Sequence, residues 1–208
     1  MKGKFITFEG GEGVGKTTQL AMMKDFLASK GADAVFLREP GGNAISEKIR
    51  AIILDTANSA MTGMCEAMLY SAARAQLCEE VIRPALEEGK FVVCDRFIDS
   101  TFAYQGIARG LGADRIETLN SFACGEIIPD LTVFLDLEPT AAFARKGGAD
   151  SDDRLEQEGI RFHNKVYSGY KLACERYPDR IVAIDCDKDA DTVHSEIVRV
   201  LAERGILK

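Results

Sequence analysis

The sequence lacks any apolar run that approaches the roughly 20 residues needed to span a bilayer. It also lacks an ordered cysteine pattern, because its six cysteines are scattered and none forms a CxxC pair. We therefore expect no membrane partner, no disulfide framework and no structural zinc. Cys94 lies in the apolar stretch FVVCD, which suits a buried thiol.

Positive charge is in deficit, with 26 Lys and Arg against 33 Asp and Glu and a formal net charge of −7. Because a protein that coats DNA or RNA needs a basic face, we expect no nucleic-acid partner. A small anionic ligand needs only a few local arginines and is not excluded. Histidine is scarce too: His163 and His194 have no carboxylate or cysteine pattern beside them, so we interpret both as helix-face residues.

The chain shows no repeat and no linker, and its 208 residues, 46% of them hydrophobic, are enough for one domain with a sizeable core. The amino terminus, MKGKFITFEG, enters a predicted strand at once. We therefore expect no signal peptide, and a reducing cytoplasm is the expected location.

Short apolar strands alternate with helical segments. Strands are predicted in KFITFEG, AVFLR, FVVCDRF, LTVFLDL and IVAID. Helices are predicted at residues 16–29, after the capping residue Asn43, at 61–88 with a bend or break at Pro84, at 101–107 and 114–124, after Pro139, and at 155–176 and 190–203. This order predicts an α/β fold with right-handed crossovers, a mostly parallel sheet and helices on both faces. Ligands of such folds bind at the carboxyl ends of the strands, where Glu9, Arg38, Asp95 and Arg96 fall.

Residues 9–18, EGGEGVGKTT, contain the phosphate-loop pattern G-x-x-x-x-G-K-[ST] between a strand and a helix. The glycines let backbone N–H groups turn toward phosphate oxygens, and the helix directs its positive end to the same place. Lys16 is expected to bridge the β- and γ-phosphates, and the Thr17 hydroxyl to reach Mg²⁺. The predicted ATP-binding residues are Gly10, Gly11, Glu12, Gly13, Val14, Gly15, Lys16, Thr17 and Thr18. Glu12 is unexpected there, because a carboxylate repels phosphate.

Five motifs in register narrow the choice among phosphate-loop proteins. FEGGEGVGKTT, REPGG, YSAARAQ, DRF-IDSTFAYQG and DRLEQE together resemble bacterial thymidylate kinases, in order from residue 5 to about 158. The resemblance implies the three-layer P-loop NTPase fold, with a five-stranded parallel sheet, as a single nucleoside monophosphate kinase domain over residues 1–208 with a mobile lid at about 145–155. It also implies transfer of the γ-phosphoryl of MgATP to the 5′-phosphate of dTMP, and a homodimer.

The resemblance assigns cations and a metal site to the reacting phosphates. Arg38, Arg50 and Arg96 are expected around the acceptor phosphate, where the planar fork of arginine suits bidentate capture. Asp95 is expected near Mg²⁺ or its waters, and Glu9 is expected to order the same shell. Three alternatives stay open: Glu9 as an acceptor of loop N–H bonds, Arg38 in a surface salt bridge, and Arg50 as a solvated helix residue.

The resemblance also places side chains around the acceptor nucleoside. Tyr70 would stack on thymine, and Arg74, on the same helix face, would donate to a base oxygen. Thr101 and Gln105 fall at base-contacting positions. Tyr104 would crowd the sugar C2′ and leave a ribose hydroxyl without room.

Glu12 is explained by the same resemblance, because the family's acid at this position faces the deoxyribose 3′-hydroxyl of the acceptor and not ATP. Gly13 replaces a loop arginine of one branch of the family, so the lid must supply the missing cation. Arg154 is the first choice and Arg145 the second, with an exposed charge as the alternative for Arg145. Gly147-Gly148 would permit the lid to move.

Two rival functions remain. A kinase for another nucleotide or a small metabolite would leave YSAARAQ and TFAYQG unexplained. A non-catalytic nucleotide switch would need a switch segment and a partner-specific motif, and the sequence shows neither.

Overall fold

The structure is a computed structural model that describes residues 3–146, 154–155 and 157–207. In that part of the chain one parallel sheet has the strand order β2-β3-β1-β4-β5. The strands are β1 (Lys4–Glu9), β2 (Ala34–Arg38), β3 (Phe91–Asp95), β4 (Leu131–Asp136) and β5 (Ile181–Asp185). The predicted α/β fold with a five-stranded parallel sheet is confirmed.

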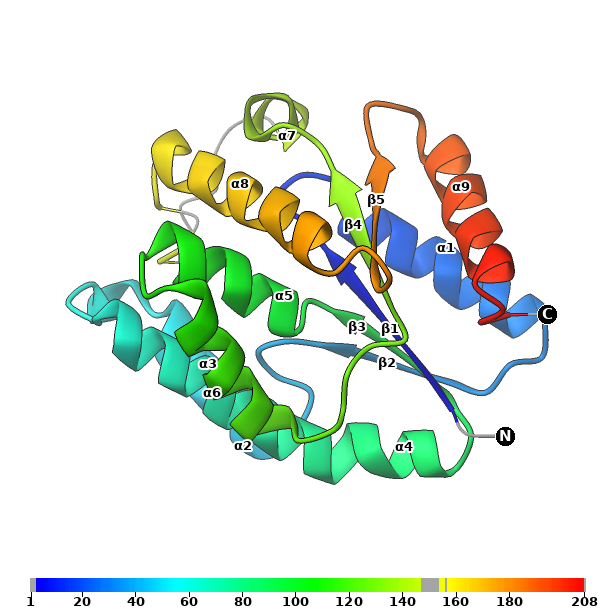
Figure 1. The fold of residues 1–208 in the computed structure, drawn as a ribbon, viewed down its shortest axis with the longest axis horizontal. Coiled ribbons are helices and arrows are strands. Elements are labelled where there is room, and N and C mark those ends of the chain that lie inside the picture. Colours follow the sequence, from blue (N-terminus) through cyan, green and yellow to red (C-terminus); the bar gives the residue numbers. More distant parts are fainter. Residues whose placement is uncertain (1–2, 147–153, 156, 208) are drawn as a thin grey trace.

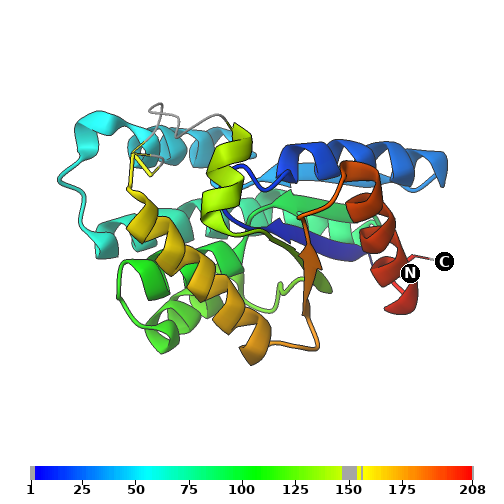
Figure 2. The same cartoon turned by 90° about the horizontal axis from the view of Figure 1, so that it is seen from above.

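Helices cover both faces of this sheet, giving three layers (Figures 1 and 2). On one face lie α1 (Lys16–Ser29), α7 (Pro139–Lys146) and α9 (Ala190–Glu203). On the other lie α3 (Gly63–Leu77), α4 (Arg83–Glu87), α5 (Ile98–Thr101), α6 (Ala113–Cys124) and α8 (Ile160–Arg176). Helix α2 (Ala44–Leu54) packs against α3. Successive β1 residues serve opposite cores: Ile6 packs with Met23 of α1, and Phe5 with Leu77 of α3. A strand buried on both faces therefore reads as a continuous apolar run.

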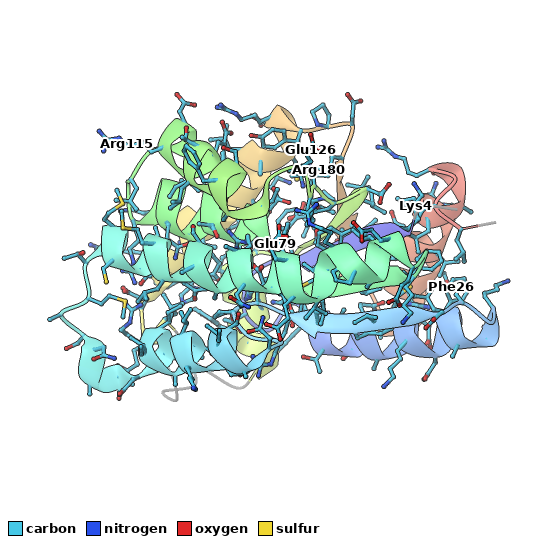
Figure 3. The ribbon with its side chains drawn as sticks, turned by 90° about the horizontal axis from the view of Figure 1, so that it is seen from below. Lys4, Phe26, Glu79, Arg115, Glu126 and Arg180 are labelled. Carbon is cyan, nitrogen blue, oxygen red and sulfur yellow. The ribbon has the colours of Figure 1, made fainter. Side chains whose placement is uncertain are left out.

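The predicted helix at 61–88 is one helical path made of two α-helices joined by a π-helical turn. Helix α3 passes into a π-helical turn, η2 (Cys78–Ile82), and then into α4, whose first turn contains Pro84. Proline inside a helical path removes a backbone hydrogen bond and clashes with the preceding turn, and the wider π-helical turn directly before Pro84 accommodates it. The path therefore continues across the lower side of the molecule, with the exposed Glu79 midway along it (Figure 3).

Three boundaries differ from the predictions. Strand β3 ends at Asp95, because Arg96 leaves the extended conformation with φ 68°. The helix predicted at 101–107 is α5 followed by a second π-helical segment, η3 (Phe102–Ala108). Helix α8 begins at Ile160 after Gly159, and not at Leu155. A short 3₁₀ turn, η1 (Thr56–Asn58), follows α2.

Most of the predicted lid, including Gly147-Gly148, lies outside the described residues, which leaves Arg145, Arg154 and Leu155 with described side chains. All six cysteines are described and free, and Cys94 is buried as predicted. His163 and His194 lie on α8 and α9 and pack against phenylalanine rings. Within the described ranges, no helix has both the length and the apolar character that a membrane crossing requires.

Candidate active site

A cavity of about 490 Å³ opens where β1, β2 and β3 end. Because these neighbouring strands are parallel, their carboxyl ends bring distant segments to one edge of the sheet. The predicted site residues that line the cavity are Glu12, Gly13, Gly15, Lys16, Thr17, Arg38, Arg50, Tyr70, Arg74, Asp95, Arg96, Thr101, Tyr104, Gln105 and Arg145. The sequence motifs therefore form one site.

The phosphate loop joins β1 to α1 as predicted. Gly10, Gly13 and Gly15 have φ angles of 144°, 73° and 99°, which only glycine adopts at little cost. Lys16 is 8% exposed, and its Nζ donates to the carbonyl oxygens of Gly11 at 2.7 Å and Gly10 at 3.3 Å. Burial lowers the pKa of Lys16 to about 8, and the charge of Arg96 acts in the same direction. The negative charge of a triphosphate in the loop would oppose both effects and raise the pKa of Lys16.

Arg96 adopts a left-handed backbone conformation that is uncommon for a non-glycine residue. Its Nη1 donates to the Gly10 carbonyl at 2.8 Å, and its Nη2 lies 2.5 Å from a Glu12 carboxylate oxygen. Its guanidinium also lies over the Tyr104 ring, 5.3 Å from the ring centre. These contacts hold the strained residue with its cation between the phosphate loop and Tyr104.

Two further arginines converge on the loop after β2. Arg38 from the end of β2 and Arg50 from α2 donate to the same carbonyl oxygen, that of Pro40, at 2.9 and 3.0 Å. Arg38 also pairs with Glu47 at 3.0 Å, so the salt bridge left open for it is present alongside its place on the cavity. The cavity therefore has a second cationic region apart from the phosphate loop.

Arg74 of α3 lines the cavity and is 1% exposed. Its Nε and Nη2 form a two-pronged ion pair with Glu39, at 2.7–3.2 Å. Its Nη2 also donates to Thr101 Oγ1 at 2.8 Å, and its Nη1 donates to Asn120 Oδ1 at 2.8 Å. Such a network fixes the plane of the guanidinium before any ligand binds. Tyr70, one turn earlier on α3, is half-buried beside it.

Tyr104 and Gln105 come from η3. The Tyr104 hydroxyl is buried and has no hydrogen-bond partner among the described residues. Burial raises the pKa of Tyr104, so its hydroxyl stays protonated. Gln105 is 2% exposed, and its amide nitrogen donates to Glu66 on α3 at 2.7 Å.

The residues predicted to hold Mg²⁺ fit it in part. Asp95 Oδ1 is buried and has no hydrogen-bond partner in the described part of the chain, and Thr17 lines the same cavity. The described residues contain no group of three His, Cys, Asp or Glu side chains that could hold a metal alone. Magnesium bound with a nucleotide needs only one or two protein oxygens, because phosphates and water supply the rest. Asp95 and Thr17 meet that requirement.

Glu9 requires a correction, because it is fully buried and does not line the cavity. Its carboxylate accepts from the backbone N–H groups of Phe97 and Ser100 at 2.7 and 3.2 Å, and from the Ser100 and Tyr170 hydroxyls at 2.6 and 2.9 Å. The open alternative, an acceptor of N–H bonds, is therefore the arrangement present. Burial, followed by the charge of Asp99, raises the pKa of Glu9 to about 7.

Arg154 also lies away from the cavity. It is 8% exposed, its Nε donates to the Ile53 carbonyl at 3.0 Å, and its Nη2 pairs with the buried Glu66. Arg145 does line the cavity, while its guanidinium bonds the Cys186 carbonyl at 2.7 Å and Asp187 at 3.1 Å. Of the two predicted lid cations, the structure brings only Arg145 to the site.

Four predicted loop residues do not line the main cavity: Gly10, Gly11, Val14 and Thr18. Six lining residues were missed by the sequence analysis: Glu39, Pro40, Leu54, Ser100, Leu155 and His163. Glu39, Pro40, Ser100 and Leu155 lie inside recognised motifs, so the motifs themselves carried a signal for them. Leu54 and His163 carry none, because only packing brings them to the site.

The chain is similar to known proteins over nearly its whole length. A sequence model of the family described as "Thymidylate kinase" matches residues 8–197. A thymidylate kinase of Bacillus velezensis is 46% identical over 205 residues, covering 98% of this chain and 97% of its own. One from Lactobacillus helveticus is 47% identical over 207 residues, covering 98% of each chain. The crystal structure of thymidylate kinase from Ehrlichia chaffeensis superposes with a TM-score of 0.80 at 29% identity, covering 97% of this chain and 100% of its own. From these matches and the site they span, the chain belongs to the thymidylate kinase family.

Proposed function

We propose that the protein transfers the γ-phosphoryl group of ATP to the 5′-phosphate of dTMP, giving ADP and dTDP. The family membership supports the reaction. The observation that carries it is that one cavity holds two cationic regions, the phosphate loop at Lys16 and the arginines that meet at Pro40. A phosphate-loop protein that only bound a nucleotide would need the first region alone.

The chemistry requires charge cancellation more than a strong base. The acceptor is already a phosphate anion, so the protein must hold two polyanions in line and stabilise the charge on the transferring group. We assign the donor phosphates to the loop and Lys16, and the acceptor phosphate to Arg38, Arg50 and Arg96. Arg96 touches both the Gly10 carbonyl and Glu12, which suits a cation between the two nucleotides.

Glu12 belongs with the acceptor in this proposal. Its pairing with Arg96 directs a carboxylate of the loop toward the cavity's nucleoside side, where a deoxyribose 3′-hydroxyl would donate to it. Tyr70 would stack on the base. Tyr104, buried against Arg96, would restrict the space at C2′.

Mg²⁺ would be held by Asp95 and Thr17 together with the triphosphate. When bound, the ion would neutralise phosphate charge. For the remaining lid cation we assign Arg145, because its side chain lines the cavity while Arg154 is buried elsewhere. A structure with dTMP and a non-hydrolysable ATP analogue tests these assignments. If Arg145 lay far from the γ-phosphate position there, its assignment as the lid cation would be wrong.

A coupled assay of ADP release tests the function. We expect turnover to depend on dTMP, to be weaker with dUMP and to be absent with AMP. Stimulation by AMP but not by dTMP would indicate another nucleoside monophosphate kinase. ATP binding with no acceptor-dependent turnover would indicate a nucleotide switch.

We also propose that residues 1–208 act as one kinase domain and that the protein is a cytoplasmic homodimer. Exposed apolar side chains on three neighbouring helices support self-association: Ile45 and Ile52 on α2, Met68 on α3 and Phe122 on α6. Fractionation of cells that produce the protein tests the cytoplasmic location.

A further inference from the structure

Glu66 is a fully buried carboxylate in the first turn of α3, outside the cavity lining. Its Oε1 accepts from Gln105 Nε2 at 2.7 Å and from Arg109 Nε at 3.2 Å. Its Oε2 accepts from Arg109 Nη2 at 3.2 Å and from Arg154 Nη2. Arg109 and Arg154 balance the negative charge of Glu66. The hydrogen bond from the neutral Gln105 amide is not needed for that balance, so it calls for a separate reason.

The two guanidiniums keep Glu66 ionised. Burial raises its pKa, but the hydrogen bonds from Gln105, Arg109 and Arg154 outweigh burial, and the net pKa is lowered. An ionised carboxylate can only accept hydrogen bonds. The NH₂ group of Gln105 must therefore point to Glu66, which leaves the amide carbonyl oxygen as the group that Gln105 can offer to a ligand in the cavity.

Arg74 supplies the complementary group. Of its two terminal nitrogens, Nη2 bonds Glu39, the Phe97 carbonyl and Thr101, whereas Nη1 bonds Asn120 alone among the described residues. Nη1 carries two hydrogens, so one N–H remains for a ligand. Thr101 accepts a hydrogen bond from Arg74 and lies one helical turn before Gln105. Arg74 is therefore bonded to the same helical path that carries Gln105.

The nucleoside end thus offers an acceptor from Gln105 and a donor from Arg74 to one ligand in the same cavity. Thymine and uracil present the matching pair, a ring N–H donor next to a carbonyl acceptor. Cytosine presents the reverse pair, a bare ring nitrogen next to an amino group. A site whose buried groups are left unpaired by the wrong base rejects that base strongly.

We propose that Glu66 is a positioning residue that sets base selectivity, because it fixes the Gln105 amide with its oxygen toward the base and so admits thymine and excludes cytosine. This inference rests on the proposed function. Glu66 acts through Gln105 and does not touch the nucleotide.

The Glu66→Gln variant tests the inference. The amide oxygen of the new side chain is attracted to the position between the Nη2 groups of Arg109 and Arg154, which turns its NH₂ toward Gln105. Gln105 must then accept with its carbonyl and turn its own NH₂ to the base. We expect the ratio of kcat/KM for dTMP over dCMP to fall by about tenfold or more, the effect of exchanging one buried hydrogen bond. Calorimetric binding of an ATP analogue should stay unchanged.

Glu158→Gln is the matched control, because it removes a carboxylate from the same cluster without touching Gln105. Glu158 pairs with Arg109 at 2.5 Å, so this variant perturbs the ion pairs but leaves the Glu66–Gln105 bond in place. We expect its dTMP-to-dCMP ratio to equal that of the wild type. An equal fall in both variants would show that loss of a carboxylate from this cluster, and not the amide orientation, controls selectivity, and would overturn the inference.

Glu66→Asp covers the case in which Glu66→Gln does not fold, as thermal unfolding would reveal. It keeps the charge for both arginines but withdraws the carboxylate from Gln105 by one methylene, so the ratio should again fall. A folded Glu66 variant with an unchanged ratio refutes the inference while leaving dTMP kinase activity standing. A wild-type protein without dTMP-dependent turnover refutes the proposed function instead.

Discussion

At the scale of single residues, the site is organised by charges held at a cost. Arg96 keeps a left-handed backbone, and Lys16 keeps an ammonium group where burial disfavours it. Both side chains donate to the Gly10 carbonyl, at 2.8 and 3.3 Å. Cations confined in this way are poised for an anion, because a bound phosphate replaces the solvent that the fold has removed.

The lowered pKa of Lys16 gives a pH-dependent prediction. In the free protein the amine loses its proton as the pH rises through about 8, whereas the triphosphate's charge raises its pKa in the complex. Binding of an ATP analogue at about pH 8.5 should therefore take up a proton, and affinity should weaken as the pH rises further. Calorimetry in two buffers of different ionisation enthalpy measures the uptake.

Lys16→Arg is the control for this measurement, because a guanidinium stays protonated at that pH and should show no uptake from this position. Equal proton uptake by the wild type and Lys16→Arg would mean that another group titrates.

At the scale of elements, helix α8 is tied closely to the π-helical segment η3 that carries Tyr104 and Gln105. Gly169 of α8 makes this approach possible, since a Cβ there would lie 2.8 Å from the Cα of Ala103. The next residue, Tyr170, reaches the Glu9 carboxylate at 2.9 Å. The packing of α8 thus positions η3, and with it one wall of the cavity.

Gly169→Ala should destabilise the protein by about 1–3 kcal/mol, because the added methyl group meets backbone that cannot move away alone. Urea unfolding measures the change. Gly159→Ala is the matched variant at the N-cap of the same helix, where the added Cβ has open space. It should change stability by only a few tenths of a kcal/mol, because the loss of a favoured N-cap residue is offset by the lower entropy of the unfolded chain. Equal losses in the two variants would contradict the close approach of α8 and η3.

At the scale of the whole molecule, the fold carries an exposed apolar surface as well as the cavity. The cavity opens at the strand ends and is lined in part by residues of α2 and α3, and α2 and α6 both pack against α3 in one helical layer (Figures 1 and 3). On that layer Phe122 is 85% exposed and Met68 is 56% exposed. Apolar side chains gathered on neighbouring helices favour burial against another protein surface.

Sedimentation equilibrium should therefore give twice the chain mass of 22.7 kDa. Phe122→Glu should shift the protein toward the monomer, because a charge in an apolar interface loses its hydration. Leu172→Glu, at a 40% exposed position on α8, is the control and should leave the mass unchanged. A wild-type protein that sediments with the mass of one chain would exclude the homodimer.

The sequence by itself determined the features whose chemistry is local. The phosphate loop, the strand-end residues and the motif REPGG are short segments, and a parallel sheet necessarily brings strand ends to one edge. The five-stranded fold was predictable for the same reason, because each strand and most helices are continuous patterns. The π-helical segments were not, since a wider helical turn leaves the periodicity of apolar residues almost unchanged.

Tertiary structure alone decided which charged residues face the cavity and which are buried beside it. Glu9 and Arg154 sit in motifs that suggested catalytic roles, yet one is bonded by the start of α5 and the other by Glu66, 88 residues away along the chain. Glu66 itself lies in an unremarked helical turn, and its partners come from two separate segments, one with Gln105 and Arg109 and the other with Arg154. Such pairings depend on how the helices pack on the sheet. No local sequence pattern encodes which residues far apart along the chain come into contact.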